Sequence, residues 1–221
     1  EQLLAPLMGT DPIVEMGMGG EEDLLLGRLE AFDPYPERFE AAFPGEPISV
    51  DNLARAIAAF ERTLITVDSP YDRYLQGEQD AMSDSAQRGM ALFFGARMGC
   101  GACHNGPFLD RPLLEDGTVA DEAGFYNTGL YNIDGEGSYP PEEPGLVAVT
   151  GDPADTGVFR TPPLRNVSAT GPWAHDGTVA SLGDMIDAYA RGGREVSSGQ
   201  YPGDGAENPY KSPLITGFEM S

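Results

Sequence analysis

Apolar positions recur at helical spacing along the first hundred residues of the chain. Residues 21–32 and 36–43 each predict a short helix, and Pro36 suits the first turn of the second one. A longer helix is predicted after Asp51, which is its expected N-cap. The apolar stripe of this longer helix consists of Leu53, Ile57, Phe60 and Leu64, which recur at i, i+4, i+7 and i+11.

A further helix is predicted just before the only cysteines of the sequence. Ser83 is its expected N-cap, and the helix runs directly toward Cys100. Its large apolar side chains are expected on the inner face; they are Met90, Phe93 and Phe94. The helix therefore delivers the chain to the part of the sequence with the most distinctive chemistry.

The last predicted helix runs from Leu182 to Arg191. Ser181 is its expected N-cap, and Asp184 three residues later forms a weak capping box with it. Gly192 and Gly193 follow directly and are expected to end the helix.

Residues 105–160 contain many glycines and prolines and show no convincing period. A loop of this length within a compact domain is usually functional or disordered. Its aromatic side chains favour packing on another part of the protein; they are Phe125, Tyr126, Tyr131 and Tyr139. One short hairpin is expected within residues 125–150. The sequence thus predicts a mainly α fold with long irregular loops and little β structure.

The charge of the chain argues against some classes of partner. Its 221 residues include 36 acidic and 13 basic ones, for a formal net charge of −23, which disfavours nucleic acid and anionic membrane surfaces. No run approaches the roughly 18 apolar residues that a membrane span needs. A cationic partner and a merely solvated acidic surface both fit this charge.

The stretch MGCGACHNGPF, residues 98–108, holds both cysteines and one of the two histidines. A disulfide between Cys100 and Cys103 would close a very small loop and leave His104 without a role. A zinc site needs more ligands than the sequence has, and a thioredoxin-like pair needs a βαβ setting. Covalent attachment of a c-type haem uses all three residues, because the thiols take the vinyl groups and the imidazole binds iron. We therefore expect a cytochrome c-like haem domain.

A low-spin haem needs a second axial ligand besides His104. Candidates by residue type are His175, the methionines and the tyrosines. Met185 and Tyr189 share one face of the helix predicted at 182–191, and either could present its side chain to a haem. Both also fit as ordinary core residues, so the helical period alone leaves the ligand open.

The stretch FRTPPLRNVSATGPWAHDGTVASLGDMIDAYARGG, residues 159–193, resembles the second-haem domain of the bacterial di-haem cytochrome c peroxidase and MauG superfamily. The stretch YARGGREVSSGQYPGDGAENPYKSPLITGF, residues 189–218, resembles more narrowly the MbnH-like branch. In that branch a haem enzyme works beside a small copper-binding partner protein. The stretches SPYDRYLQG, AQRGMALFF and FYNTGLYN also match, so the resemblance covers essentially the whole chain.

This resemblance implies that Cys100 and Cys103 hold a second haem with His104 as its proximal ligand. Fourteen residues after the histidine at His175, peroxidases of the family carry a methionine as distal ligand and MauG-like enzymes carry a tyrosine; this chain has Tyr189. A phenolate is a hard donor that favours ferric and higher-valent iron. The implied enzyme is an oxidoreductase that uses hydrogen peroxide and high-valent iron to oxidise a partner protein side chain, a tryptophan, or a small electron donor.

The resemblance also implies roles away from this motif. The segment PIVEMG, residues 12–17, resembles the family's P-x-E-M segment and makes Glu15 the acid/base in the distal pocket of the first haem. Gln2 resembles the glutamine that accompanies it. The backbone carbonyls of Thr170 and Pro172 match calcium ligands between the haems, and oxygen donors suit Ca²⁺.

Two arginines and the second histidine remain. Arg160 and Arg165 are charged residues in an otherwise apolar and proline-rich run, and either pairing with haem propionates or a structural salt bridge would explain them. His175 is expected to hydrogen-bond near the site between the haems rather than to bind iron.

The chain departs from the family in having one C-x-x-C-H motif where the family has two. We therefore expect part of a longer protein: residues 1–80 as a connecting helical segment that borders an upstream first-haem domain, and residues 81–221 as the second haem domain. The alternative is a one-haem electron-transfer module without peroxidase activity. The resemblance implies a periplasmic location, because bacteria attach haem to C-x-x-C-H outside the cytoplasm.

Overall fold

The computed structural model describes residues 7–9 and 17–220. By its internal contacts the chain divides between Val67 and Asp68 into two compact parts, unit 1 before this point and unit 2 after it. The division lies ahead of the boundary expected after residue 80, so α5 (Pro70–Leu75) and the 3-10 turn η1 (Gln79–Ala81) belong to unit 2. Glu15 and Gln2 lie outside the described residues.

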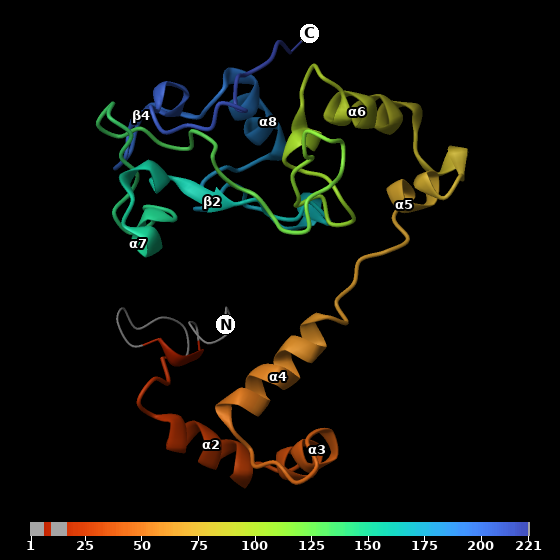
Figure 1. The fold of residues 1–221 in the computed structure, drawn as a ribbon, viewed down its shortest axis with the longest axis vertical. Helices are drawn as coiled ribbons and strands as arrows, with labels where there is room; N and C mark the ends of the chain where they lie inside the picture. Colours follow the sequence, from red (N-terminus) through yellow and green to blue (C-terminus); the bar gives the residue numbers. More distant parts are fainter. Residues whose placement is uncertain (1–6, 10–16, 221) are drawn as a thin grey trace. The chain divides into compact units, whose positions relative to one another are not determined.

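In the described part of unit 1 the helices with given bounds are α2 (Glu22–Ala31), α3 (Tyr35–Ala42) and α4 (Val50–Glu61) (Figure 1). The N-cap prediction for α4 was wrong by two residues, because the hydroxyl of Ser49 accepts the hydrogen bond from the backbone N–H of Asn52 at 3.1 Å. Asp51 lies instead in the first turn, where a carboxylate stabilises the positive end of the helix dipole.

The hydrophobic core of unit 1 is small. Leu7, Met18 and Leu25 are buried together, and Leu53 from the predicted stripe of α4 packs against them. The C-terminal part of that stripe does not share this burial, since Phe60 is 63% exposed. The apolar stripe therefore divides into a packed half and an exposed half.

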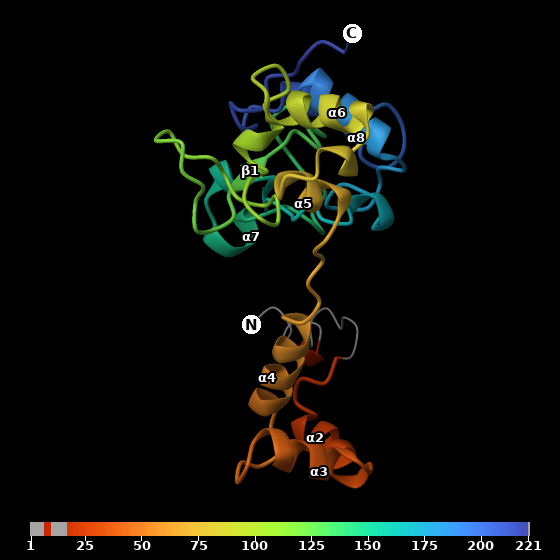
Figure 2. The ribbon, with the colours of Figure 1, turned by 90° about the vertical axis from the view of Figure 1, so that its right-hand side faces the viewer.

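Unit 2 is built around α6 (Asp84–Phe94), the 3-10 turn η2 (Cys100–Ala102) and α8 (Leu182–Arg191) (Figures 1 and 2). The predicted N-cap of α6 is confirmed, since the Ser83 hydroxyl accepts the N–H of Ala86. Both predicted ends of α8 are also confirmed. The Ser181 hydroxyl accepts the N–H of Asp184 at 3.0 Å, and Gly192 ends the helix in the left-handed region.

The capping box predicted at α8 is only half formed. The carboxylate of Asp184 accepts a hydrogen bond from the hydroxyl of Ser181 at 2.7 Å, whereas a full box would take the backbone N–H of Ser181. A complete box occurs where none was predicted, at α5, between Ser69 and Asp72.

The β structure consists of two small antiparallel pairs within the described residues. Strand β1 (Phe125–Asn127) pairs with β2 (Val158–Arg160), and β3 (Glu195–Val196) pairs with β4 (Gly203–Asp204). The hairpin expected within 125–150 was wrong, because the partner of β1 lies beyond residue 150. The remaining short elements are α7 (Val147–Thr150), η3 (Pro153–Asp155), η4 (Val167–Ala169) and η5 (Gly205–Glu207). The predicted mainly α fold with little β structure is confirmed.

Buried asparagines order the long loops of unit 2. The side chain of Asn127, 1% exposed, donates to the carbonyl of Thr156 at 2.8 Å and accepts from the N–H of Gly129 and the hydroxyl of Tyr139. Asn208 likewise donates to a buried backbone carbonyl. These amides satisfy backbone groups that no helix or sheet satisfies, so the loops pack without regular secondary structure.

Candidate functional site

The C-x-x-C-H motif forms one tight turn directly after α6. Gly99 starts the turn in the left-handed region, with φ of 64°, and the N–H of His104 closes it on the carbonyl of Cys100 at 2.9 Å. A Cβ atom on Gly101 would lie 2.7 Å from the ring of Phe94, so any larger residue here would require that ring to move. Phe94 itself is 40% exposed, which departs from the inner position expected for it. The turn presents both thiols and the imidazole from five consecutive residues.

The two thiols are partly buried and form no disulfide. Burial raises the pKa of both Cys100 and Cys103, and a hydrogen bond with the hydroxyl of Tyr126 partly offsets this rise for the pKa of Cys103. Both are therefore neutral thiols at neutral pH. Tyr126 comes from strand β1, so an element more than twenty residues further along the chain reaches the sulfur.

The imidazole of His104 is held in one tautomer. Its Nδ1 lies 2.8 Å from the carbonyl oxygen of Leu109, and because a carbonyl only accepts hydrogen bonds, Nδ1 carries the proton. The lone pair of Nε2 is then available to a metal. Burial lowers the pKa of His104, although the Leu109 carbonyl and the charge of Asp110 act in the opposite direction. The ring is therefore neutral at neutral pH, as a metal ligand must be.

The backbone of Leu109 is unusual. Its φ is 57°, in the left-handed region that residues other than glycine rarely adopt. This strain turns the carbonyl toward His104, and such strain collects at functional sites. The sequence gives no signal for this contact, because it belongs to a main-chain group.

Tyr189 lies on the partly buried face of α8, together with Leu182 and Met185. Burial raises the pKa of Tyr189 to about 12, and electrostatic interaction with Cys103 and Cys100 adds to this rise. The phenol is thus within electrostatic range of both sulfurs, although α8 is more than eighty residues further along the chain.

The two arginines have carboxylate partners in the structure. Arg165 binds both oxygens of Asp72, at 2.9 and 2.6 Å, and its Nε donates to the carbonyl of Pro107 at 2.6 Å. Arg160, more than half exposed, lies 3.5 Å from the carboxylate of Asp110. Arg165 thus adopts the structural salt bridge, one of its two expected roles, and Arg160 forms a looser pair.

Asp110 was not singled out by the sequence. Its side chain is almost fully buried, and its Oδ1 has no hydrogen-bond partner among the described residues. It is also 3.8 Å from the guanidinium of Arg111. Asp110 also acts on the imidazole of His104, where it opposes the larger lowering of the pKa by burial.

His175, Thr170 and Pro172 lie in the segment between η4 and α8. The Nε2 of His175 is 3.0 Å from a carboxylate oxygen of Glu143, and its ring stacks on Phe159 at a centroid distance of 3.8 Å. Its Nε2 is thus engaged with a carboxylate, in line with the expectation that it does not bind iron. Among the described residues no three His, Cys, Asp or Glu side chains gather into a metal cluster, so a calcium ion here would depend on the carbonyls of Thr170 and Pro172.

This donor set fits a c-type haem. Two neutral thiols are available for thioether bonds, one neutral imidazole has a free Nε2, and a phenol lies near both thiols. Imidazole and phenol oxygen are both known axial ligands of haem iron. The residues that could hold it are Cys100, Cys103, His104 and Tyr189.

Comparison with known proteins also supports a c-type haem protein. The sequence model for the di-haem cytochrome c peroxidase family matches residues 1–80. A cytochrome-c peroxidase of Pseudomonas sp. (strain SCT) is 36% identical over 193 residues, which cover 81% of this chain and 51% of that protein. A solved MauG-like protein associated with microbial copper homeostasis is 43% identical with a TM-score of 0.89, covering all of this chain and 63% of that one. The chain belongs to the di-haem cytochrome c peroxidase and MauG family.

The relatives of this chain include both cytochrome c peroxidases and MauG proteins. The methylamine utilization protein MauG of Methylorubrum extorquens is 35% identical over 200 residues, which cover 89% of this chain and 50% of that protein. The chain spans about half the length of the curated relatives it matches. None of the helices in the described ranges has the length and apolar character that a membrane crossing requires.

Proposed function

We propose that this chain is the second-haem portion of a periplasmic di-haem enzyme that uses hydrogen peroxide to oxidise a tryptophan side chain on a partner protein. The observation that supports the proposal is a C-x-x-C-H turn with a neutral imidazole at His104, whose thiols interact electrostatically with the buried phenol of Tyr189. Membership of a family that contains peroxidases and MauG supports the peroxide chemistry.

Each residue of the site has a definite task in this proposal. Cys100 and Cys103 would hold the haem through two thioether bonds. The Leu109 carbonyl keeps the proton on Nδ1 of His104, so Nε2 would be the nitrogen offered to the iron. Tyr189 would offer its phenol oxygen as a second protein ligand. When bound, the haem supplies an iron that these ligands bias toward the ferric and higher oxidation states.

A tyrosine ligand at position 189 favours an oxidase over an electron-transfer protein. A methionine thioether at this position would favour ferrous iron and raise the reduction potential, which suits an electron-transfer cytochrome. A phenolate lowers the potential and suits a site that stores oxidising equivalents. Met185, one helical turn earlier, is the side chain that would support the electron-transfer alternative.

The partner is proposed to be a small copper-binding periplasmic protein. The support is the similarity, at 43% identity, to a MauG-like protein associated with microbial copper homeostasis. The net charge of −23 would steer a cationic partner toward the enzyme. A small electron donor is the second substrate class that the peroxidase relatives support.

The first-haem half of the enzyme is part of the same proposal. Glu15 and Gln2 would belong to the distal pocket of the first haem, with Glu15 moving a proton during cleavage of the peroxide bond. The carbonyls of Thr170 and Pro172 would bind a calcium ion between the haems. Residues 1–80 would then connect the two haem domains.

The test is a haem count combined with a peroxide reaction on the purified full-length protein. Pyridine-haemochrome absorbance and intact mass should give two covalent haems for each chain. Peroxide should change the haem spectrum, and a candidate copper-binding partner should then show a mass change confined to a tryptophan-containing peptide. One haem, together with no spectral response to peroxide, would overturn the proposal in favour of the electron-transfer module.

A further inference from the structure

The carboxylate of Asp110 is buried in unit 2 without a full set of partners. Its side chain is 10% exposed, and its Oδ1 accepts no hydrogen bond among the described residues. A buried carboxylate oxygen without such a partner costs stability, and native folds retain very few of them. Positions at which a fold departs from this rule are often functional, so Asp110 is a candidate for a role other than packing.

Two arginines lie near this carboxylate but leave part of its charge uncompensated. The Nη2 of Arg160 is 3.5 Å from Oδ2, and the Nε of Arg111 is 3.8 Å from Oδ1. Both distances exceed those of a charge-assisted hydrogen bond. The side chain of Arg160 is also more than half exposed, so water screens its charge. The negative charge of Asp110 therefore still acts on nearby groups in the interior.

The peptide group between Leu109 and Asp110 connects this carboxylate to the imidazole of His104. Its carbonyl accepts the hydrogen bond from Nδ1 of the ring at 2.8 Å, and its N–H donates to the carbonyl of Asn105 at 3.2 Å. The peptide group is thus bonded to two consecutive residues, the histidine of the motif and the residue after it. Asp110 therefore belongs to the same piece of backbone that orients the ring.

The loop that carries Asp110 is held at two further points. The Nε of Arg165 donates to the carbonyl of Pro107 at 2.6 Å, and the backbone N–H of Leu164 donates to the carbonyl of Phe108 at 3.1 Å. Both donors come from a segment more than fifty residues further along the chain, so the loop does not depend on local contacts alone. The position of the carboxylate relative to the ring is therefore well defined.

The charge of Asp110 acts on the imidazole of His104. It opposes the lowering of the pKa of His104 by burial, which means that it stabilises positive charge on the ring. A metal ion bound to Nε2 is exposed to the same field, because charge near a ligating imidazole makes the imidazole a stronger donor. Ferric iron carries one more positive charge than ferrous iron, so a nearby carboxylate favours the ferric state.

We propose that the buried carboxylate of Asp110 lowers the reduction potential of the haem held by this chain, by acting through the imidazole of His104. The inference rests on the proposed function, in which His104 binds the iron of that haem. Asp110 acts through another residue and is therefore a positioning residue, not an iron ligand. Asp110 and Tyr189 would then favour the oxidised haem by two independent means.

The experiment is a spectroelectrochemical titration of the full-length holoenzyme. The difference spectrum between the wild type and His104→Ala gives the absorption bands of this haem, and its potential is followed at those bands. In Asp110→Asn, which removes the charge and keeps the shape, we expect the ratio of ferrous to ferric haem at a fixed solution potential to rise about tenfold. For a one-electron couple this equals a rise of about 59 mV in the reduction potential.

Two further variants separate the charge of Asp110 from its packing and from the net charge of the chain. Asp110→Glu keeps the charge, so the ratio should stay within about twofold of the wild type. Glu115→Gln removes the same charge from an exposed side chain five residues further along the chain. Water and salt screen that charge, so the ratio should again change by less than about twofold.

The possible failures are distinguishable. An unaltered spectrum in His104→Ala would overturn the proposed function and this inference with it. A changed spectrum in His104→Ala, combined with a wild-type potential in Asp110→Asn or with equal shifts in Asp110→Asn and Glu115→Gln, would overturn the inference alone. Thermal unfolding of the two Asp110 variants completes the test, because a purely structural role would lower the Tm of both variants and leave both potentials at the wild-type value.

Discussion

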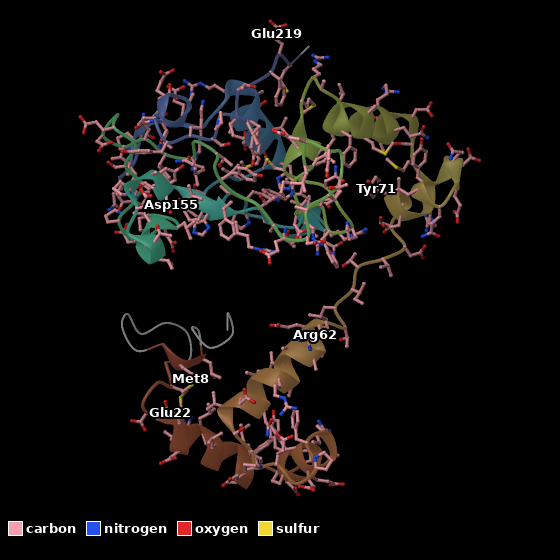
Figure 3. The ribbon with its side chains drawn as sticks, in the orientation of Figure 1. Met8, Glu22, Arg62, Tyr71, Asp155 and Glu219 are labelled. Atoms are coloured by element: carbon pink, nitrogen blue, oxygen red, sulfur yellow. The ribbon has the colours of Figure 1, made fainter. Side chains whose placement is uncertain are left out.

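The ion pair between Arg165 and Asp72 joins three segments of unit 2 and gives the sharpest stability prediction. The guanidinium contacts both carboxylate oxygens of Asp72 on α5 and also donates to the carbonyl of Pro107, three residues after His104. The two charged side chains are only 17% and 12% exposed. Figure 3 shows the neighbouring Tyr71 on the same helix, and its ring stacks on Phe94 of α6. The pair therefore fastens α5 to the loop that follows the C-x-x-C-H turn.

Replacing Arg165 with Met keeps the aliphatic stem and removes the charge. Breaking a buried pair by removing one partner typically costs 3–5 kcal/mol, because the remaining charge is uncompensated. Asp72 keeps hydrogen bonds from the N–H and hydroxyl of Ser69, so we expect a loss near the lower end, about 3 kcal/mol. For a unit of this size that corresponds to a fall in Tm of about 6–12 °C.

Thermal unfolding of the haem-loaded protein, followed by far-UV circular dichroism, measures this change. The matched control is Glu46→Gln, which breaks the pair of Glu46 with Arg55, where both side chains are about half exposed, and should cost about 0–1 kcal/mol. Asp72→Asn in the Arg165→Met background should recover part of the loss, since no buried charge then remains. A Tm that falls by less than about 2 °C in Arg165→Met would refute the reasoning from burial.

Four further outcomes follow from the structure. Tyr189→Met should raise the reduction potential of the haem held by this chain, whereas Met185→Leu should leave it unchanged in a spectroelectrochemical titration; equal potentials in all three proteins would exclude Tyr189 as a ligand. His104→Ala should keep the haem attached but abolish its low-spin absorption spectrum, and an unaltered spectrum would refute the proximal assignment. Asn127→Ala removes three buried hydrogen bonds and should cost about 3 kcal/mol in urea unfolding, with a cost below about 1 kcal/mol counting against the structural role of the amide. The Arg165 guanidinium holds the pKa of Asp72 well below its usual value, so the ion pair stabilises the folded state fully above about pH 4 and loses this effect at lower pH. Asp72→Asn should therefore make the free energy of unfolding less sensitive to acid, and an unchanged dependence of that free energy on pH would contradict this.

The elements that the sequence predicts well are those whose signals are local. Both ends of α8 follow from Ser181 and Gly192, whose hydroxyl and backbone freedom act within one helical turn. The N-cap of α4 was missed because two capping residues, Ser49 and Asp51, stand two positions apart and only the backbone geometry selects between them. The pairing of β1 with β2 was missed because it joins residues about thirty positions apart.

In the candidate site, too, the sequence predicts the residues with local signals and misses the contacts between distant segments. The motif identifies Cys100, Cys103 and His104, because the attachment chemistry fixes their spacing. The carbonyl of Leu109 has no side-chain signal, since any residue has a carbonyl and only a positive φ turns this one toward the ring. The partner of Arg165 lies 93 residues away, so the sequence left two roles open that only the tertiary structure distinguishes.

The segment with the weakest sequence pattern makes specific contacts with later parts of unit 2. Between residues 112 and 159 the chain has ten acidic side chains and no Lys or Arg, and two of these acids bond the aromatic residues of unit 2. Glu142 accepts from Tyr201, and Glu143 bonds His175. These two neighbouring carboxylates thus connect the acidic segment to side chains 32 and 59 residues further along the chain, so part of its acidity serves tertiary contacts as well as solubility.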